Sequence, residues 1–180
     1  MTESPKNNIR CFLKTVLAQL PLHRRKEGQA KFLSVIAHLH AANALILSFA
    51  SFGDEIETSL INQFLAINGC LLLPKIEGIQ LIIYHVNNPT TDLLTNQFGI
   101  KEPNPKLCQK VFPSQIRKVL VPALGFDRQK NRIGYGKGFY DRFLCLNPKI
   151  KTYGVGFREQ MIEKLPTAAH DIPLDSLLLF

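Results

Sequence analysis

The chain lacks the long apolar runs and the paired cysteines that mark membrane proteins and disulfide-bonded secreted proteins. Its most apolar stretch, residues 44–50, is interrupted by Ser48 and is far too short to span a bilayer. The N-terminal sequence MTESPKNNIR contains no apolar segment of the secretory type. The four cysteines are scattered without a C-x-x-C pair, which favours free thiols over a zinc site or a disulfide framework. We therefore expect a cytoplasmic protein with no membrane partner.

Several familiar catalytic patterns are also missing. No Ser/His/Asp order or nucleophile elbow is present, and His38 and His40 point apart on a helix, which disfavours a metal site there. The Walker A pattern requires Ser or Thr after Lys137, where Gly138 stands. The dinucleotide fingerprint requires a glycine where Phe139 stands. These mismatches exclude P-loop kinases and nicotinamide enzymes.

The segment 125–144, GFDRQKNRIGYGKGFYDRFL, is the most informative part of the chain. Glycines at alternate positions let a backbone approach a ligand closely, and turned N–H groups before a helix bind anions. Arg132 and Lys137 supply mobile cationic donors to the same place. Glycines alone also fit a plain surface turn, but the buried strand expected at 119–122 and the apolar helix stripe after the loop favour a phosphate site. The alternating glycines are Gly134, Gly136 and Gly138.

Length and charge narrow the class of protein further. At 180 residues the chain fits one compact domain spanning 1–180, and its 46% apolar and 20% charged content is ordinary for a globular protein. The net charge of +8 is divided into basic ends, 1–40 and 101–180, around an acidic middle. This distribution suits a polyanion, which could be a nucleic acid, a nucleoside triphosphate or a substrate with several carboxylates. An RNA-binding module is disfavoured because the chain has no aromatic-rich strand of the RRM type.

Apolar periodicity predicts strands that alternate with helices. We expect helices at 6–20, capped by Ser4-Pro5, and at 27–40, 58–68 and after the glycines; strands are expected at 44–49, 70–73, 80–86, 117–121, 152–157 and 177–180. Pro74 is expected to stop the second strand, 87–113 to be mostly loop and 177–180 to lie at an edge. The pattern predicts an α/β fold, a single-domain three-layer Rossmann-like sandwich with a mostly parallel central sheet flanked by helices. Ligands of such sheets bind at the carboxyl ends of the strands, and the glycines follow one of them.

Segments 121–127 and 131–142 together resemble the signature of the 5-formyltetrahydrofolate cyclo-ligase family, also called 5,10-methenyltetrahydrofolate synthetase. Ala123, Ile133 and Phe139 replace a glycine, a leucine and a tyrosine of that signature, and none of the changes removes a charged group. The resemblance extends over nearly the whole chain and implies ATP- and Mg²⁺-dependent conversion of 5-formyltetrahydrofolate to 5,10-methenyltetrahydrofolate, with release of ADP and phosphate. The alternative is a non-catalytic phosphate- or nucleotide-binding protein of the same fold. The other motifs that match the cyclo-ligase family are D-E-I-E-T at 54–58, L-P-K at 73–75, E-P at 102–103 and H-D-I-P-L-D at 170–175.

The resemblance implies an ATP site, with Lys137 and Arg132 as the catalytic residues that stabilise the phosphate charge. By spacing alone Lys6 and Arg10 share a helix face and would be two solvated charges. Mg²⁺ takes few protein carboxylates, and the resemblance places it on Asp141 and Asp171, which singly would be a helix salt bridge and a turn former. Asp127 and Asp175 are interpreted as structural. The implied ATP-binding residues are Lys6, Arg10, Arg132, Ile133, Gly134, Tyr135, Gly136, Lys137, Gly138, Phe139 and Tyr140.

The resemblance also implies a folate site around Glu55. From sequence alone Glu55 equally fits an acid of a helix start, but a carboxylate suits the paired N–H donors of a pterin edge. Glu102-Pro103 matches a family pair whose role the sequence does not define. The substrate is expected to be 5-formyltetrahydrofolate, polyglutamylated forms included, the protein to be a monomer, and nucleic acid not to be a partner. The implied substrate-binding residues are Ala50, Phe52, Glu55, Lys75, Tyr135, Gly136, Lys137 and Gly138.

Overall fold

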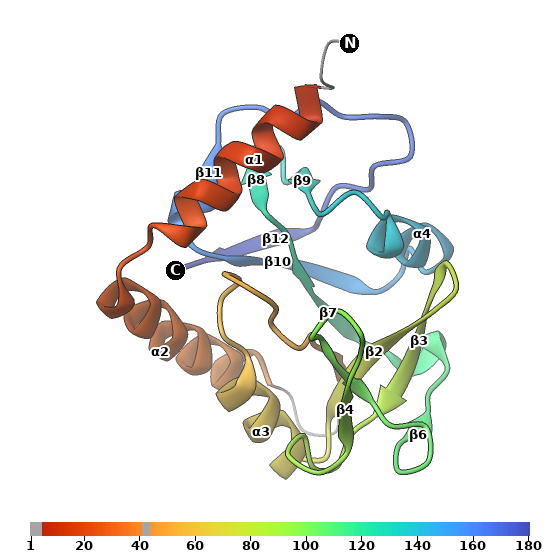
Figure 1. Ribbon diagram of the computed structural model, residues 1–180. Helices are drawn as coiled ribbons and strands as arrows, with labels where there is room; N and C mark the ends of the chain where they lie inside the picture. The colour runs from red at the N-terminus through yellow and green to blue at the C-terminus, as the bar shows by residue number, and fades with distance from the viewer. Residues whose placement is uncertain (1–4, 41–43) are drawn as a thin grey trace.

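A seven-stranded sheet organises the protein, with the strand order β12-β10-β7-β1-β2-β3-β6 (Figure 1). The computed structural model describes residues 5–40 and 44–180, so the expected cap at Ser4 lies outside the described residues. The strands of this sheet are β1 (Ile46–Leu47), β2 (Leu71–Glu77), β3 (Gln80–His85), β6 (Gln109–Lys110), β7 (Lys118–Pro122), β10 (Lys151–Gly156) and β12 (Ser176–Leu179). The helices are α1 (Pro5–Ala18), α2 (Leu22–Leu39), α3 (Ser59–Ile67) and α4 (Phe139–Leu146).

The sheet is mostly parallel, as predicted. Strand β1 pairs in parallel with β2 and β7, and β10 pairs in parallel with β7 and β12. Strand β3 pairs in antiparallel fashion with β2 and β6. The predicted C-terminal edge strand is confirmed, because β12 ends the strand order beside β10.

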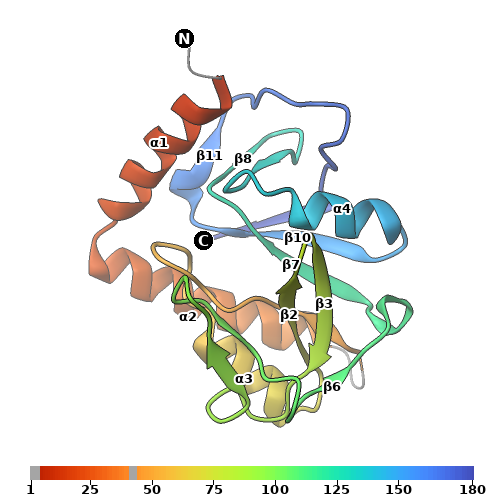
Figure 2. The same ribbon diagram turned by 45° about the vertical axis from the view of Figure 1, so that its right-hand side comes forward.

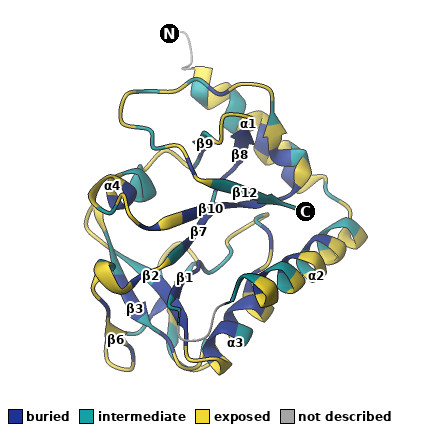
Figure 3. Ribbon diagram, turned by 180° about the vertical axis from the view of Figure 1, so that it is seen from behind, coloured by how far each residue is buried: buried dark blue, intermediate teal, exposed yellow. Residues whose placement is uncertain are grey.

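Alternating apolar residues divide the core into two layers, one on each face of the sheet. Leu71 and Leu73 lie in a buried cluster with residues of α1, α2 and α3. Leu72, which points to the opposite face, lies in a second cluster with Phe143 and Leu144 of α4. Figures 2 and 3 show α2 and α3 on one side of the sheet, with their buried residues inward, and α4 on the other. Burial of each such apolar side chain stabilises the folded state by roughly 1.5–3 kcal/mol.

The prediction that Pro74 stops its strand is wrong, because β2 continues to Glu77. The carbonyl of Leu72 accepts from Ser48 N, and Pro74, two residues further, faces the same neighbour without an N–H to donate. Pairing with β1 therefore ends there. Pairing with β3 continues, because Pro74 is the partner of Ile83 and the register runs on to Glu77 and Gln80. The chain is free to leave the sheet after Ser48, and it forms a loop at the carboxyl edge.

The predicted start of the second helix also requires correction. Helix α2 begins at Leu22, five residues before the expected start, because Pro21 is extended and the helix can begin directly after it. The segment 87–113 is mostly loop, as predicted, with short elements inside it. It contains β4 (Leu93–Thr95), β5 (Lys101–Pro103), β6 and the start of the 3-10 turn η1 (Pro113–Gln115).

A small three-stranded sheet was not predicted at all. It consists of β8 (Gly125–Asp127), β9 (Arg132–Ile133) and β11 (Met161–Ile162), and the short turn η2 (Arg158–Gln160) precedes β11. The hairpin β8–β9 separates β7 from the glycines. Across residues 5–40 and 44–180, no helix combines the length and the apolarity needed to cross a membrane.

Candidate active site

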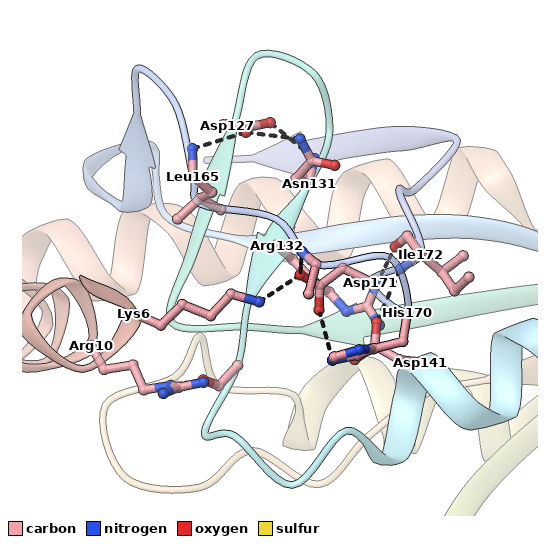
Figure 4. A network of polar contacts seen from close by, with 12 residues as sticks. Lys6, Arg10, Asp127, Asn131, Arg132, Asp141, Leu165, His170, Asp171 and Ile172 are labelled. Atoms are coloured by element: carbon pink, nitrogen blue, oxygen red, sulfur yellow. Dashed lines mark hydrogen bonds and ion pairs between the residues drawn. The ribbon is translucent and has the colours of Figure 1, made fainter. Parts of the chain in front are cut away.

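The glycine loop, residues 134–138, follows the hairpin β8–β9 and leads directly into α4. Asp127 fixes the hairpin, because its buried carboxylate accepts from Gln129 N, Asn131 N and Leu165 N at 2.9, 2.9 and 3.1 Å (Figure 4). Burial alone would raise the pKa of Asp127, but these hydrogen bonds and one from the Asn131 side chain outweigh it and lower the pKa. The predicted structural role of Asp127 is confirmed.

The backbone of the glycine loop presents unused donors. Gly136 and Gly138 have φ values of 96° and 65°, which only glycine adopts without strain. Gly138 occupies the N-cap position of α4, so the first turn of that helix also points its N–H groups outward. No backbone N–H from Gly134 to Gly138 donates to any residue in the described part of the chain. The loop therefore offers several unused donors to an anion.

Two cations of α1 contact residues more than 120 positions away in sequence, Arg10 at the glycine loop and Lys6 at Asp171. Arg10 Nε donates to Gly134 O at 2.9 Å, and its guanidinium lies close to Gly136, where an added Cβ would stand 3.2 Å from Nη2. Lys6 Nζ donates to Asp171 Oδ2 at 2.5 Å. The i, i+4 spacing thus places both side chains on the helix face that contacts the site, and neither is simply solvated.

Arg132 differs from the mobile donor that the sequence suggested. Its side chain is only 6% exposed, and it donates from Nη2 to Asp141 Oδ1 and from Nη1 to Ile172 O, both at 2.6 Å. Burial lowers the pKa of Arg132, and the nearby charges of Asp141 and Asp171 oppose that shift. Arginine is most often exposed, which is why sequence reasoning missed this buried position. We call Lys6, Arg132, Asp141 and Asp171 the ion-pair network.

The two aspartates expected to bind magnesium both lie in this network (Figure 4). Asp171 accepts from Lys6 and from Ala168 N, and these bonds outweigh burial and lower its pKa. The contacts of Asp141 within the described residues, from Arg132 and Ile172 N, all use Oδ1. One oxygen of Asp141 thus stays available, and Mg²⁺ commonly uses one or two carboxylates together with water and phosphate oxygens. The donor set fits that ion, while residues 5–40 and 44–180 contain no larger group of metal-ligating side chains.

Glu55 lies apart from the ion-pair network, in a group that also contains Phe52, Tyr135 and Tyr140. Burial raises the pKa of Glu55 to about 7, against opposing hydrogen bonds from Phe52 N and the Tyr135 hydroxyl. The rings of Phe52 and Tyr135 meet edge to face, 6.4 Å apart. Burial, and next the charge of Glu55, raise the pKa of both Tyr135 and Tyr140, so both hydroxyls stay protonated. We call these four residues the Glu55 cluster.

The helix-start interpretation of the acidic segment applies to Glu57 and not to Glu55. Glu57 Oε1 accepts from Ser59 N, the first residue of α3, at 2.9 Å. Glu55 precedes that helix by four residues and faces the glycine loop instead. Thr58 Oγ1 donates to Phe49 O at 2.8 Å, and this bond joins the two ends of the loop that contains Glu55. Ala50, half-buried, lies within the same loop.

Arg25 is a site-supporting residue that the sequence did not reveal. Its Nη2 donates to Asp54 Oδ1 at 2.8 Å and also to Leu17 O at the end of α1. This ties the loop that contains Glu55 to the helix that contains Lys6 and Arg10. Arg24-Arg25 looks like an ordinary basic pair in sequence, and only the tertiary structure distinguishes its second member.

Lys75 and Glu102 form a pair beside the carboxyl edge of the sheet. Lys75 Nζ lies 3.9 Å from Glu102 Oε2, and the other carboxylate oxygen of Glu102 accepts from Ile76 N at 3.2 Å. The buried Glu102 therefore attaches β5 to β2 and orients the Lys75 ammonium. No ion pair or hydrogen bond connects Lys75 with the glycine loop among the described residues.

The remaining predicted residues fall in and around the loop. Lys137 is exposed, and no hydrogen bond or ion pair of its ammonium occurs within the described chain. Its carbonyl accepts from Arg142 Nη2 at 2.9 Å, and Arg142 also donates to Ile79 O and covers the Phe139 ring. Ile133 is buried, so only its backbone can face a ligand. Arg142 thus fixes the back of the loop, which leaves the Lys137 side chain directed to solvent.

Comparison with known proteins identifies the family. The model of the 5-formyltetrahydrofolate cyclo-ligase family matches residues 2–179. The chain is similar to a Haemophilus influenzae 5-formyltetrahydrofolate cyclo-ligase, with 30% identity covering 99% of this chain and 100% of the relative, and to the Mus musculus enzyme, with 28% identity covering 97% and 93%. Its structure is similar to that of Aquifex aeolicus 5,10-methenyltetrahydrofolate synthetase, with a TM-score of 0.84, 29% identity and coverage of 97% and 89%. The chain belongs to the 5-formyltetrahydrofolate cyclo-ligase family, ATP-using ligases that convert 5-formyltetrahydrofolate to 5,10-methenyltetrahydrofolate in folate one-carbon metabolism.

Proposed function

We propose that this chain performs the cyclo-ligase reaction with the glycine loop holding ATP phosphates beside the formyl group of the folate. One observation supports this most strongly. The loop has unused N–H donors, and it lies between two unlike groups, the ion-pair network and the Glu55 cluster. An anion with an associated cation suits the first group, and a planar ring with N–H donors suits the second.

The nucleotide side of the site uses the exposed cation and the loop backbone. Lys137 reaches the transferring phosphoryl group, because its exposed ammonium has no partner in the described chain and the loop backbone around it has unused N–H donors. Arg10 sets the position of the loop and adds positive charge, and Lys6 holds Asp171. Arg132, which is buried behind the loop, adds positive charge to the phosphate site and holds Asp141 in position by a hydrogen bond. Asp141 and Asp171 would hold Mg²⁺, which neutralises phosphate charge when it is bound.

The folate side uses the Glu55 cluster. The ionised Glu55 carboxylate accepts two N–H donors of the pterin edge, and Phe52 and Tyr135 form the wall against its ring. Ala50 lies in the same loop, and Lys75 contributes a cation at the edge of the sheet. We further propose that the protein acts as a cytoplasmic monomer and that its substrates include polyglutamylated folates.

The chemistry divides into two balanced steps. The γ-phosphoryl group leaves ADP and bonds to the formyl oxygen, which turns a poor leaving group into a phosphate ester on an imidate-like carbon. The folate N10 then attacks that carbon and loses its proton, and the carbon–oxygen bond breaks to release phosphate. Such phosphoryl transfer depends mainly on positioning and charge stabilisation, which the loop and Lys137 provide.

The purified protein tests the proposal directly. It is incubated with ATP, Mg²⁺ and 5-formyltetrahydrofolate while the near-ultraviolet absorbance of the methenyl product is followed. We expect absorbance to rise only when all three components are present. A folded protein that binds ATP and folate without any rise would contradict the proposal and would match a binding protein of the same fold.

A further inference from the structure

The basic face of α1 continues beyond Arg10. Lys14 is the next residue at a spacing of four, one turn further along the helix. Its Nζ lies over the Tyr135 ring, 5.7 Å from the centroid. Lys6, Arg10 and Lys14 therefore contact Asp171, Gly134 and Tyr135 in turn, so three cations follow one helix face beside the site.

Lys14 differs from Lys6 in having no carboxylate partner. Over residues 5–40 and 44–180, no ion pair or hydrogen bond involves its ammonium, which contacts only the face of an aromatic ring. Asp54, an acid whose charge also acts on Tyr135, is already paired with Arg25 at 2.8 Å. A cation over an aromatic face is held only weakly, so its three donors stay available for an anion.

The position of Lys14 assigns it to the folate side of the site. The Tyr135 ring that it covers is the ring that meets Phe52 and whose hydroxyl reaches Glu55. The ion-pair network lies at the other end of the helix, since Lys14 stands two turns, roughly 12 Å along the axis, from Lys6. An anion bound by Lys14 is therefore separated from Asp171 and adjoins the ring wall.

We propose that Lys14 is a specificity residue for the substrate, with its ammonium binding a carboxylate of the folate glutamate tail. The inference rests on the proposed function, because it requires the pterin to lie at the Glu55 cluster. Of the groups in 5-formyltetrahydrofolate, only the glutamate carboxylates are anionic, and a compact ammonium on a flexible stem suits a mobile tail better than a planar guanidinium would. Additional glutamates add carboxylates within reach of the same cation.

The test compares Lys14→Ala with wild type on three substrates: the primary amide of 5-formyltetrahydropteroate, which has no carboxylate and is called the pteroate below, the monoglutamate and the triglutamate. We expect KM to rise about tenfold for the monoglutamate and at least as much for the triglutamate. KM for the pteroate, KM for ATP and kcat should stay unchanged. Lys26→Ala, which removes an exposed lysine of α2, is the matched control and should change none of these values.

Three results would overturn the proposal. An equal rise of KM for the pteroate would mean that Lys14 acts only through Tyr135. A rise of KM for ATP alone would assign Lys14 to the nucleotide, and unchanged kinetics would remove any role. Equilibrium binding of the same three folates, measured by calorimetry without ATP, separates this inference from the proposed function. A protein without turnover that still loses its preference for glutamylated folate in Lys14→Ala would refute the reaction and support the role of Lys14.

Discussion

The ion-pair network and the Glu55 cluster lie on two sides of one loop, and the carboxyl groups of the two regions have opposite environments. In the network, each aspartate has a cationic partner, and the Lys6 contact helps to lower the pKa of Asp171. In the cluster, no cation among residues 5–40 and 44–180 pairs with Glu55, and burial raises its pKa to about 7. Both aspartates of the network are paired with cations before any ligand binds. The cluster is incomplete, and its carboxyl group gains its best partners only from a ligand that donates N–H groups.

The largest expected effect comes from Lys137, whose ammonium has no partner in the described part of the chain. Lys137→Ala should lower kcat about 1,000-fold with the fold intact, because it removes an exposed ammonium of the loop proposed to stabilise the transferring phosphoryl group. Single-turnover assays and a thermal unfolding curve measure the two properties. Lys149→Ala, an exposed lysine beyond α4, is the control and should keep full activity. Wild-type turnover by Lys137→Ala would exclude this lysine from the chemistry.

The network should be the region whose disruption affects stability and metal use together. Asp141→Asn leaves the buried Arg132 charge without a carboxylate, so the free energy of unfolding should fall by about 2 kcal/mol. The activity should fall about 100-fold, and a higher Mg²⁺ concentration should be needed for half-maximal rate.

Urea unfolding and a Mg²⁺ titration check this prediction. Asp175→Asn is a suitable comparison, because Asp175 is ion-paired with Lys151 and accepts from Thr152 outside the site. That variant should lose stability but keep the Mg²⁺ dependence of wild type. An Asp141→Asn enzyme with unchanged Mg²⁺ dependence would show that the network does not hold the metal.

The loop between the two regions should be sensitive to a single methyl group. Gly136→Ala meets both a positive φ and the Arg10 guanidinium, so activity should fall about tenfold and stability by about 1 kcal/mol. Gly99→Ala has a similar φ of 80° but open space around the new methyl group. It should lose similar stability and no activity. Equal activity of the two variants would mean that loop shape does not matter for catalysis.

The smallest effect, a pH dependence, should come from the Glu55 cluster. Since the ionised carboxylate binds the pterin and its pKa is about 7, KM for 5-formyltetrahydrofolate should fall by up to about tenfold between pH 6 and 8. Steady-state kinetics across this range measure the change. Glu55→Gln should have a high KM that varies little with pH. A wild-type KM that rises with pH would contradict the assignment.

The same group predicts how the stability of the free protein depends on pH. The folded-state pKa of about 7 lies above the ordinary value of 4.5, so the folded protein binds more protons between these values. The contribution of Glu55 to stability is therefore present below about pH 4.5 and is lost as pH rises through about 7. Glu55→Gln should be more stable than wild type at pH 8, by about 1 kcal/mol after allowance for its partial exposure. Unfolding of both proteins at pH 5 and 8 tests this.

The local pattern of apolar residues was sufficient to predict most of the central sheet, but it was insufficient to predict the contacts of the site. The short apolar run Leu71-Leu72-Leu73, with Gly69 before it and Pro74 after it, indicates a strand buried on both faces, and the mostly parallel α/β fold is predicted from such runs. The extension of β2 past Pro74 was missed because it depends on where β1 ends. The hairpin β8–β9 was missed because its strands are only two or three residues long and because its turn depends on three hydrogen bonds to the Asp127 carboxylate from Gln129 and Asn131.

The site residues show that sequence does not predict which distant residues pair with one another. Lys6 and Asp171 are 165 positions apart, and nothing in their local sequence indicates that they form an ion pair. They were named only through the family resemblance, and Arg25 and Lys14, which it did not supply, were missed. The burial of Arg132 was also missed, because its partners Asp141 and Ile172 come from two different segments. Charge pairing across a fold is a tertiary property.

The central claim is that the loop brings an ATP phosphate to the formyl oxygen of a folate held at the Glu55 cluster. The most direct measurement uses 5-formyltetrahydrofolate with ¹⁸O in the formyl group and mass spectrometry of the phosphate released during one turnover. The account predicts one ¹⁸O atom in each released phosphate for the wild-type protein and no labelled phosphate above background for Lys137→Ala. Methenyl product formed with unlabelled phosphate would contradict the account, because the formyl oxygen would then have left by another route.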